Sequence, residues 1–295
     1  MKKTIGILSP GDMGHGVGGR LVENGVRVIY CSDGRSARTR DLAKAAHIEA
    51  VPTYDALVNQ ADIVLSILVP AAAKGAAVMV AQALTRTHAN VLYVDCNAIA
   101  PQTVIEIGQI ITDAGSAFLD ASIIGGPPRG EYTPRIYISG NDTQQLDFLN
   151  THGLNILHLS ERAGDASALK MCFAASTKGS TALYLTLMSA ARALGVSDAL
   201  IEEFRMGQRL ESMERGVTRV AVKSRRFVGE MEEMDKTFTA VGIHPNMLAG
   251  AAEIYRLMGE THLADRVPED TSPFPSLDET LDIMVAHLEG KTNAD

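Results

Sequence analysis

Lys170 is the side chain of this sequence whose surroundings best suit proton transfer. It lies one turn into a long apolar segment, and its neighbours are Leu169, Met171, Cys172 and Phe173. Burial among such residues lowers the pKa of a lysine towards neutrality, and a lysine with that pKa can act as a general acid or base. The spacing alone is equally consistent with a lysine that reaches solvent from the start of its helix. Thr177, seven residues on, lies on the same helical face.

A glycine turn near the start of the chain has the residue types of a phosphate site. The apolar run Thr4–Leu8 is followed by Ser9-Pro10-Gly11-Asp12-Met13-Gly14 and then by a helix-length segment. Gly11 and Gly14 occupy the second and third glycine positions of a G-x-G-x-x-G turn, and Ser9 stands at the first. In such a turn the backbone approaches a pyrophosphate, and the helix N-terminus directs its N–H groups at it. We therefore expect a dinucleotide cofactor; an ordinary glycine turn is the alternative.

The residues after the next strand candidate, Val26–Tyr30, bear on which dinucleotide binds. A carboxylate there binds the ribose 2′-hydroxyl of NAD, whereas NADP requires small polar groups and arginines around its 2′-phosphate. Four residues fit the second pattern and favour NADP over NAD: Ser32, Arg35, Ser36 and Arg38. The alternative has Asp33 as the acid of an NAD site and Ser36 as a helix N-cap.

These residues need a scaffold of alternating strands and helices. The strand candidates in the first half are Thr4–Leu8, Val26–Tyr30, Ile63–Leu68, Val91–Asp95, Ala117–Asp120 and Arg135–Ser139. The alternation predicts an α/β Rossmann domain over residues 1–162, with a doubly wound, mostly parallel sheet. Ligands bind such sheets beyond the carboxyl ends of the strands, and the loops there add Val69 and Asn97 to the expected cofactor site.

From Gly164 onward the pattern is helical, and an all-α domain is predicted over residues 163–295. We expect it to bind substrate and to form a homodimer, because its longest helix carries apolar residues on more than one face. Those residues are Leu183, Leu185, Leu187 and Met188. The expected helices are Ser167–Leu194, Ser197–Val217, Val228–Val241, Pro245–Met258 and Leu277–Leu288.

Composition excludes several classes of protein. The 295 residues carry a formal net charge of −8, which argues against a general nucleic-acid surface. No histidine pair has the spacing of a metal site with acidic or cysteine partners, so no metal is expected. Without a signal peptide or an apolar run of membrane-spanning length, we expect a cytoplasmic protein. The three cysteines, Cys31, Cys96 and Cys172, are expected to be buried free thiols.

The whole chain resembles the β-hydroxyacid dehydrogenase and 6-phosphogluconate dehydrogenase superfamily. Four segments stand in the family order: Pro10–Gly14 resembles its G-x-G-x-M-G turn, Asp95–Pro101 its D-x-S-T-x-x-P loop, Asp120–Gly126 its D-A-P-V-S-G-G loop, and Gly164–Lys170 the approach to its catalytic lysine. The likeness is greatest to a poorly characterised branch with P-G-x-M-G, D-x-N-A and G-E-M-E-E motifs, the last of which is Gly229–Glu233 here.

The resemblance implies a Rossmann domain joined through one long helix to a helical dimerisation domain, with Lys170 as catalytic residue. The family's substrate loop implies that Gly125 and Gly126 border the substrate, and the candidates to replace the polar contacts that this chain lacks are Asn97, Ser122, Thr177 and Glu230. Three polar contacts of the family are altered, because Ala174, Ile124 and the pair Gly229-Glu230 stand in their places. A minimal 3-hydroxy acid bound in the usual way is therefore not expected.

These observations together predict an NADP(H)-dependent oxidoreductase. A hydride would pass between the nicotinamide and a carbinol or carbonyl carbon, with Lys170 as general acid or base. The substrate would be a non-minimal 3-hydroxy acid or related alcohol. Two alternatives stay open: an imine reductase-like enzyme on the same fold, and a non-catalytic NADP-binding protein.

Overall fold

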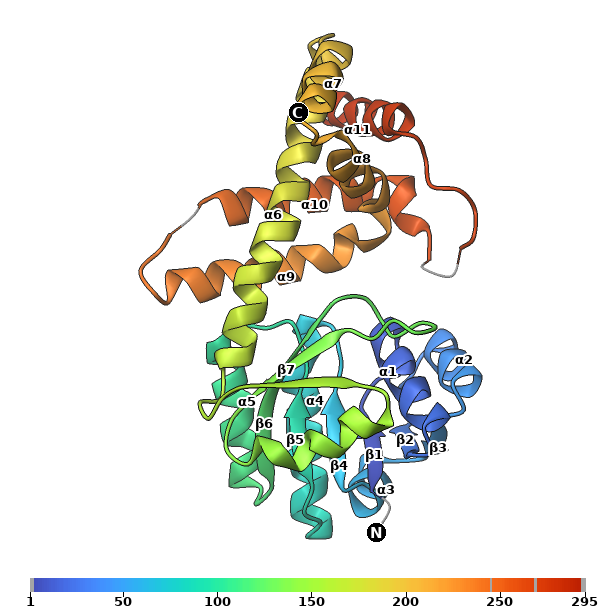
Figure 1. The fold of residues 1–295 in the computed structure, drawn as a ribbon, viewed down its shortest axis with the longest axis vertical. Helices are drawn as coiled ribbons and strands as arrows, with labels where there is room; N and C mark the ends of the chain where they lie inside the picture. The colour runs from blue at the N-terminus through green and yellow to red at the C-terminus, as the bar shows by residue number, and fades with distance from the viewer. Residues whose placement is uncertain (1–2, 245, 268–269, 293–295) are drawn as a thin grey trace. The chain divides into compact units, whose positions relative to one another are not determined.

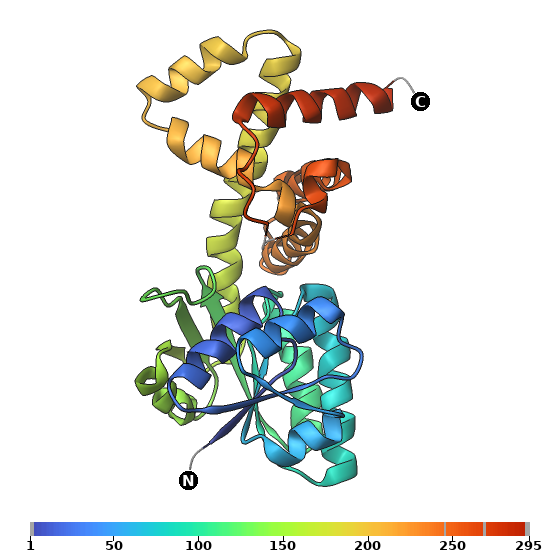
Figure 2. The same ribbon diagram turned by 90° about the vertical axis from the view of Figure 1, so that its right-hand side faces the viewer.

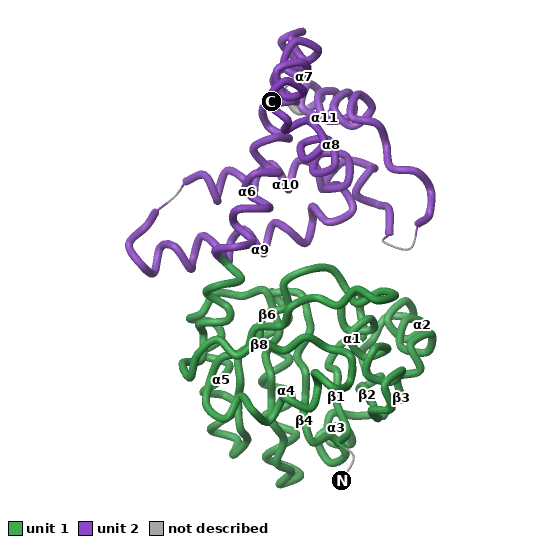
Figure 3. The backbone as a smooth tube through the Cα atoms, viewed as in Figure 1, with its two compact units in different colours: residues 1–171 green, residues 172–295 purple. Residues whose placement is uncertain are grey.

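The computed structural model describes residues 3–244, 246–267 and 270–292. The chain divides into two compact units, residues 1–171 and 172–295 (Figure 3). The division falls within the long helix α6 (Asp165–Ala193), whereas the sequence pattern changes near residue 163. The first turns of α6 belong with the first unit because their hydrogen bonds go to its strands.

Within the described residues, the first unit contains one eight-stranded sheet in the order β3-β2-β1-β4-β5-β6-β7-β8. Its strands are β1 (Thr4–Ile7), β2 (Arg27–Cys31), β3 (Glu49–Val51), β4 (Ile63–Ser66), β5 (Leu92–Asp95), β6 (Ala117–Ile124), β7 (Arg135–Ser139) and β8 (Asn155–Ser160). All neighbouring pairs are parallel except β6 and β7. This is the doubly wound, mostly parallel sheet that the sequence predicts. The strand order reverses between β1 and β4, the place at which such sheets bind ligands.

Helices cover both faces of this sheet, as Figures 1 and 2 show. One apolar core joins the sheet to α1 (Asp12–Glu23), α2 (Ala37–Ala45) and the 3-10 segment η1 (Thr143–His152). The other joins it to α3 (Tyr54–Gln60), α4 (Pro70–Thr87) and α5 (Pro101–Asp113). Because both faces are buried, the central strands read as continuous apolar runs.

Two strands, β3 and β8, are not predicted by the sequence. The first has three residues, Glu49–Val51, two of them exposed, and so shows no alternation. The second is recognisable only through its parallel pairing with β7. Strand β6 also continues to Ile124, past the expected end at Asp120, because antiparallel β7 pairs with its whole second half.

The second unit is all-α. After α6 it comprises α7 (Ser197–Met206), α8 (Leu210–Arg219), α9 (Ala221–Thr239), α10 (Asn246–Glu260), the 3-10 turn η2 (His262–Asp265) and α11 (Leu277–Thr292). The single helix expected over Ser197–Val217 is two helices, because the chain turns at Gln208, which has a positive φ of 56°. Helices α9 and α10 lie side by side (Figures 1 and 2), and the rings of Phe227 and Tyr255 meet edge to face between them.

The cysteine expectation needs correction. All three thiols are free, but only Cys31 is buried, while Cys96 is half-buried and Cys172 is exposed. Cys172 lies on α6, and on a helix only the positions facing the core are buried, so apolar neighbours in sequence do not determine exposure. Cys96 directly follows the end of β5. No helix in the described part of the chain has the length and apolarity to cross a membrane.

Candidate functional site

The glycine turn between β1 and α1 is built around a close backbone approach. A Cβ atom at Gly14 would lie 2.1 Å from the backbone oxygen of Ser9, so no side chain fits there. At Gly11 a Cβ atom would have no heavy atom within 4 Å, which leaves open space beside the turn. Gly14 is therefore required by the fold itself, whereas Gly11 borders room for a ligand.

The N-terminus of α1 is suited to an anion. Gly11 is its N-cap and provides no side-chain capping bond, while Ser36 caps α2 through Thr39 and Thr53 caps α3 through Ala56. An uncapped helix start presents N–H groups and a positive dipole end, the combination that binds phosphate. Asp12 adds a negative charge in the first turn, with Arg129 4.0 Å away.

The loop after β6 lies against this turn. A Cβ atom at Gly16 in α1 would come within 2.9 Å of Pro127, so the two segments are in direct contact. Gly125 has φ +133°, and a Cβ there would lie 2.1 Å from the Tyr132 hydroxyl oxygen. The fold thus joins two motifs that are more than a hundred residues apart, and Gly125 is needed for the loop conformation.

Asn97 ties together the loops after β4 and β5. Its Oδ1 accepts a 2.6 Å hydrogen bond from the N–H of Leu68, and its Nδ2 donates at 2.9 Å both to Ser66 Oγ and to Asp95 Oδ2. Both amide hydrogens are thereby used, and the residue is only 2% exposed. Asn97 fixes the loop that leads to Val69, which is the exposed N-cap of α4.

Asp95, which accepts hydrogen bonds from Asn97, is fully buried. Burial raises the pKa of this carboxyl to about 7 despite the two hydrogen bonds from Asn97, and the neighbouring charge of Asp120 acts in the same direction as burial.

The residues after β2 differ in how far the fold already uses their polar groups. The Ser32 hydroxyl donates to the carbonyl of Val51, and Ser36 caps α2. Arg35 donates from Nη2 to the hydroxyl of Tyr54 at 2.8 Å, and its buried Nε has no hydrogen-bond partner among the described residues. Arg38 is exposed.

Lys170 extends from α6 to β6. Its half-buried ammonium group donates to the carbonyl oxygen of Ile123, near the carboxyl end of that strand. Ser122, the preceding residue of the strand, is fully buried, and its hydroxyl has no hydrogen-bond partner in the described structure. Ile124 and Ala174, where the family has polar residues, are both buried.

Thr177 and Glu230 belong to the second unit. Thr177 is exposed and donates to the carbonyl of Ala174 on its own helix. Glu230 is 6% exposed and forms ion pairs with Lys178 at 2.9 Å and Arg226 at 3.2 Å. Its carboxylate thus joins α9 to α6. The sequence analysis did not foresee the ion pair of Lys178 with Glu230. A helical wheel shows that Lys178 points away from Lys170, but it does not show which residue of another helix Lys178 contacts.

The described residues contain no group of three or more histidine, cysteine, aspartate or glutamate side chains that could hold a metal ion.

Comparison with known proteins agrees with the fold. Residues 4–150 match the family described as the NAD binding domain of 6-phosphogluconate dehydrogenase, and residues 191–258 match a domain of unknown function. An uncharacterized 28.5 kDa protein of Methanothermus fervidus is 28% identical over 238 residues, which is 80% of this chain and 91% of that protein.

Two solved structures share the fold. The conserved protein of unknown function MTH1747, described as structurally similar to 3-hydroxyacid dehydrogenases, has 29% identity and a TM-score of 0.66, covering 86% of this chain and 96% of its own. The 3-hydroxyisobutyrate dehydrogenase of Mycobacterium tuberculosis, solved with L-serine, has 16% identity and a TM-score of 0.70, covering 97% and 99%. The chain therefore belongs to the β-hydroxyacid dehydrogenase and 6-phosphogluconate dehydrogenase superfamily of NAD(P)-dependent oxidoreductases.

Proposed function

We propose that this protein is an NADP(H)-dependent dehydrogenase that transfers a hydride between the cofactor and a hydroxyl- or carbonyl-bearing carbon. The observation that carries the proposal is the position of Lys170. Its ammonium group donates a hydrogen bond to the carbonyl oxygen of Ile123, near the carboxyl end of β6. Strands β1, β4, β5 and β6 are parallel neighbours. The open N-terminus of α1 and Lys170 therefore belong to the same edge of one sheet.

Lys170 would move the proton that accompanies the hydride. During oxidation the neutral amine takes the proton of the substrate hydroxyl while the carbon–hydrogen bond breaks and its electron pair leaves as hydride. During reduction the ammonium group returns a proton to the carbonyl oxygen. When bound, the nicotinamide ring supplies the hydride acceptor or donor.

The preference for NADP is supported by Arg35. Its Nη2 is oriented by Tyr54, and its Nε is a buried donor without a partner in the described structure. A phosphate oxygen would satisfy such a donor with a charge-assisted hydrogen bond. Ser36, which already accepts from Thr39, and Ser32, which donates to Val51, would contribute less.

The substrate is proposed to be a non-minimal 3-hydroxy acid or a related alcohol. The buried apolar side chains of Ala174 and Ile124 offer no hydrogen bond to a carboxylate. Asn97, which is 2% exposed, would support the loops after β4 and β5 rather than touch the substrate. Ser122 is 0% exposed, and its hydroxyl has no hydrogen-bond partner among the described residues. The backbone of Gly125 and Gly126 would contact the substrate in the loop after β6. The hydroxyl of Thr177, which is exposed on α6, would be a further contact.

The test is turnover by the full-length protein and by Lys170→Ala with a panel of hydroxy acids, alcohols, carbonyl compounds and imines. The alanine variant is expected to lose about two to four orders of magnitude in rate with unchanged NADPH affinity. Lys170→Arg should not restore activity, because a guanidinium group stays protonated. Replacing the exposed Lys44 with alanine is the control. Turnover of imines alone, or of no compound in the panel, would contradict the proposal in favour of an imine reductase or a non-catalytic protein.

We also propose that a second copy of the chain covers part of the helical unit. Leu185 and Met188 of α6 are fully buried, whereas Leu183 is 58% exposed. Further large apolar side chains are exposed on the same unit, including Leu194, Val196 and Met206. Burying such surface against a twin is a common source of dimer stability.

A further inference from the structure

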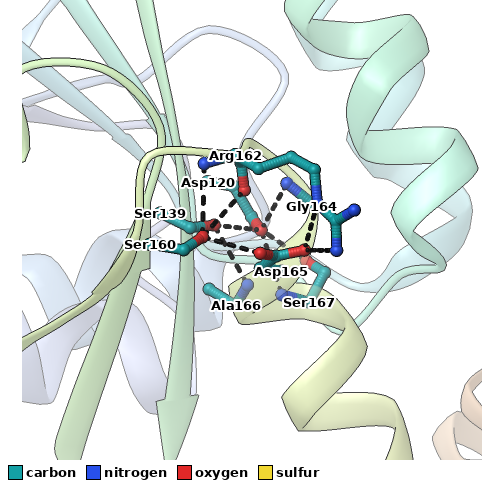
Figure 4. Close-up of polar contacts among 8 residues, drawn as sticks. All are labelled: Asp120, Ser139, Ser160, Arg162, Gly164, Asp165, Ala166 and Ser167. Carbon is teal, nitrogen blue, oxygen red and sulfur yellow. Dashed lines mark hydrogen bonds and ion pairs between the residues drawn. The ribbon is translucent and has the colours of Figure 1, made fainter.

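Asp120 caps the helix that carries Lys170, although it lies on a strand far away in the sequence. Its Oδ2 accepts hydrogen bonds from Ser139 Oγ at 3.1 Å and from the N–H groups of Gly164 and Ser167 at 3.0 Å each. Its Oδ1 accepts from Ser167 Oγ at 2.7 Å. Figure 4 shows the carboxylate surrounded by these donors. An acceptor from β6 thus satisfies N–H groups that a local cap satisfies in most helices.

Ser139 extends the same cap from β7. Its hydroxyl donates to Asp120 and accepts from the N–H of Ala166 at 3.0 Å (Figure 4). The first turn of α6 is therefore bound through Gly164, Ala166 and Ser167 to two adjacent strands. A cap from a neighbouring residue would stabilise the helix alone, whereas this cap also fixes where the helix stands on the sheet.

The same strand holds α6 at a second point. Asp120 and Ile123 are three residues apart on β6, and their partners, Ser167 and Lys170, are three residues apart on α6. The two attachments make the position of Lys170 dependent on the position of Ser167. Burial raises the pKa of the Asp120 carboxyl, while the hydrogen bonds from Ser167, Ser139 and Gly164 act in the opposite direction.

We infer that Asp120 is the positioning residue for Lys170: it clamps the start of α6 onto β6 so that the amine is presented at the strand end. This inference rests on the proton-transfer role proposed above for Lys170. The clamp itself concerns only the attachment of the helix, so it can be measured separately from turnover.

Asp165 provides a matched control on the same helix turn. Its carboxylate accepts from Ser160 Oγ at 2.7 Å and from Arg162 Nε at 2.8 Å, and no bond of its side chain to β6 is found among the described residues (Figure 4). Asp120→Asn and Asp165→Asn each replace one carboxyl group near the start of α6 with an amide of the same size. Only Asp120→Asn weakens the clamp.

The experiment measures the accessibility and pKa of Lys170 without a substrate. Full-length protein bound to NADPH is labelled with trace acetic anhydride across a pH series, and the Lys170 peptide is quantified by mass spectrometry against the exposed Lys44. In Asp120→Asn the labelling curve of Lys170 should move towards that of Lys44, with a rate change at pH 8 of about threefold or more, equivalent to about 0.5 in pKa. Hydrogen exchange of the peptide from Gly164 to Lys170 should accelerate in the same variant.

Asp165→Asn should leave both readouts as in the parent. If Asp120→Asn does not fold, Ser167→Ala, which deletes only the Oγ contact, is held to the same criterion. If folded Asp120→Asn gives the same Lys170 labelling curve as the parent protein, the proposal that Asp120 positions Lys170 is wrong. If the curve moves while Lys170→Ala retains turnover, the clamp stands and the proposed role of Lys170 fails.

Discussion

Asp95 and Asp120 are directly paired across β5 and β6, and both carboxyl groups are fully buried. Asp95 accepts from Asn97, which joins the loops after β4 and β5, and Asp120 accepts from the start of α6. These two neighbouring carboxyl groups thus hold the loop at Asn97, which belongs to the proposed cofactor site, and the start of α6, which carries the proposed proton-transfer residue. Because they lie side by side at low dielectric, burial and mutual repulsion both oppose a second charge.

The burial of Asp95 makes the stability of the protein depend on pH. Burial raises the pKa of Asp95 from an ordinary 3.8 to about 7, so between these values the folded state holds a proton that the unfolded state has lost. The contribution of Asp95 to the free energy of unfolding should therefore fall as the pH rises from about 4 to about 7, and stay constant above that. Each tenfold difference in proton affinity corresponds to about 1.4 kcal/mol.

The measurement is urea unfolding of the parent and of Asp95→Asn at several pH values in this window. The variant should gain stability relative to the parent as the pH increases. A ¹³C NMR titration of the carboxyl carbon gives the pKa directly. Parallel stability profiles together with an ordinary pKa would show that Asp95 is not desolvated in solution.

Gly14→Ala and Gly11→Ala should separate folding from cofactor binding. An added Cβ at residue 14 meets the Ser9 carbonyl at 2.1 Å, so this variant should lose about 1–3 kcal/mol of stability, as expected for overpacking. At residue 11 the added methyl meets no protein atom, so the melting temperature should stay unchanged while NADPH affinity falls. Unaltered NADPH binding by Gly11→Ala would place the pyrophosphate elsewhere.

Arg35→Ala should discriminate between the two cofactors. Losing a charge-assisted hydrogen bond costs roughly 1.5–3 kcal/mol, so NADPH affinity should drop by about ten- to a hundredfold while NADH affinity changes little. The chain has no tryptophan, so the fluorescence of the reduced nicotinamide itself reports binding. Lys44→Ala, on the helix α2 that follows Arg35 in the chain, controls for loss of positive charge. Equal affinity of the parent for NADH and NADPH would refute the proposed preference.

Breaking the Lys178–Glu230 pair should destabilise the helical unit. Their side chains are 15% and 8% exposed, and removal of one partner from a buried pair typically costs about 3–5 kcal/mol. Lys178→Met, Glu230→Gln and the double variant form a cycle read by thermal unfolding. Glu202→Gln, from an ion pair exposed by more than half, should cost about 0–1 kcal/mol. If Glu230→Gln is as stable as the parent but turns over substrate more slowly, Glu230 binds the substrate instead of stabilising the helical unit.

The proposed homodimer predicts a molar mass by light scattering near twice 31.5 kDa at micromolar concentration. Leu183→Lys should shift the protein towards monomer, because it places a charge on an exposed apolar position of α6. A monomeric parent protein would contradict the proposal.

Local sequence patterns were sufficient for the architecture of the first unit. Apolar runs bounded by turns predicted six of its strands, and the glycine turn predicted the β1 to α1 connection, because these features depend on near neighbours in the chain. The same reasoning failed for β3, which is short and mostly exposed. It also missed the break between α7 and α8, although Gly207, the C-cap of α7, directly precedes Gln208. Lys170 could be singled out because its apolar neighbours are adjacent in sequence.

Only the tertiary structure decided what the polar side chains do. Asn97 bonds to Leu68 across 29 residues, and Asp120 bonds to Gly164 and Ser167 across 44 and 47. Glu230, which the sequence offered as a substrate ligand, pairs with Lys178 from another helix. A buried polar group must find a partner, but which partner it finds depends on the packing of distant elements, and no periodicity along the chain records that choice.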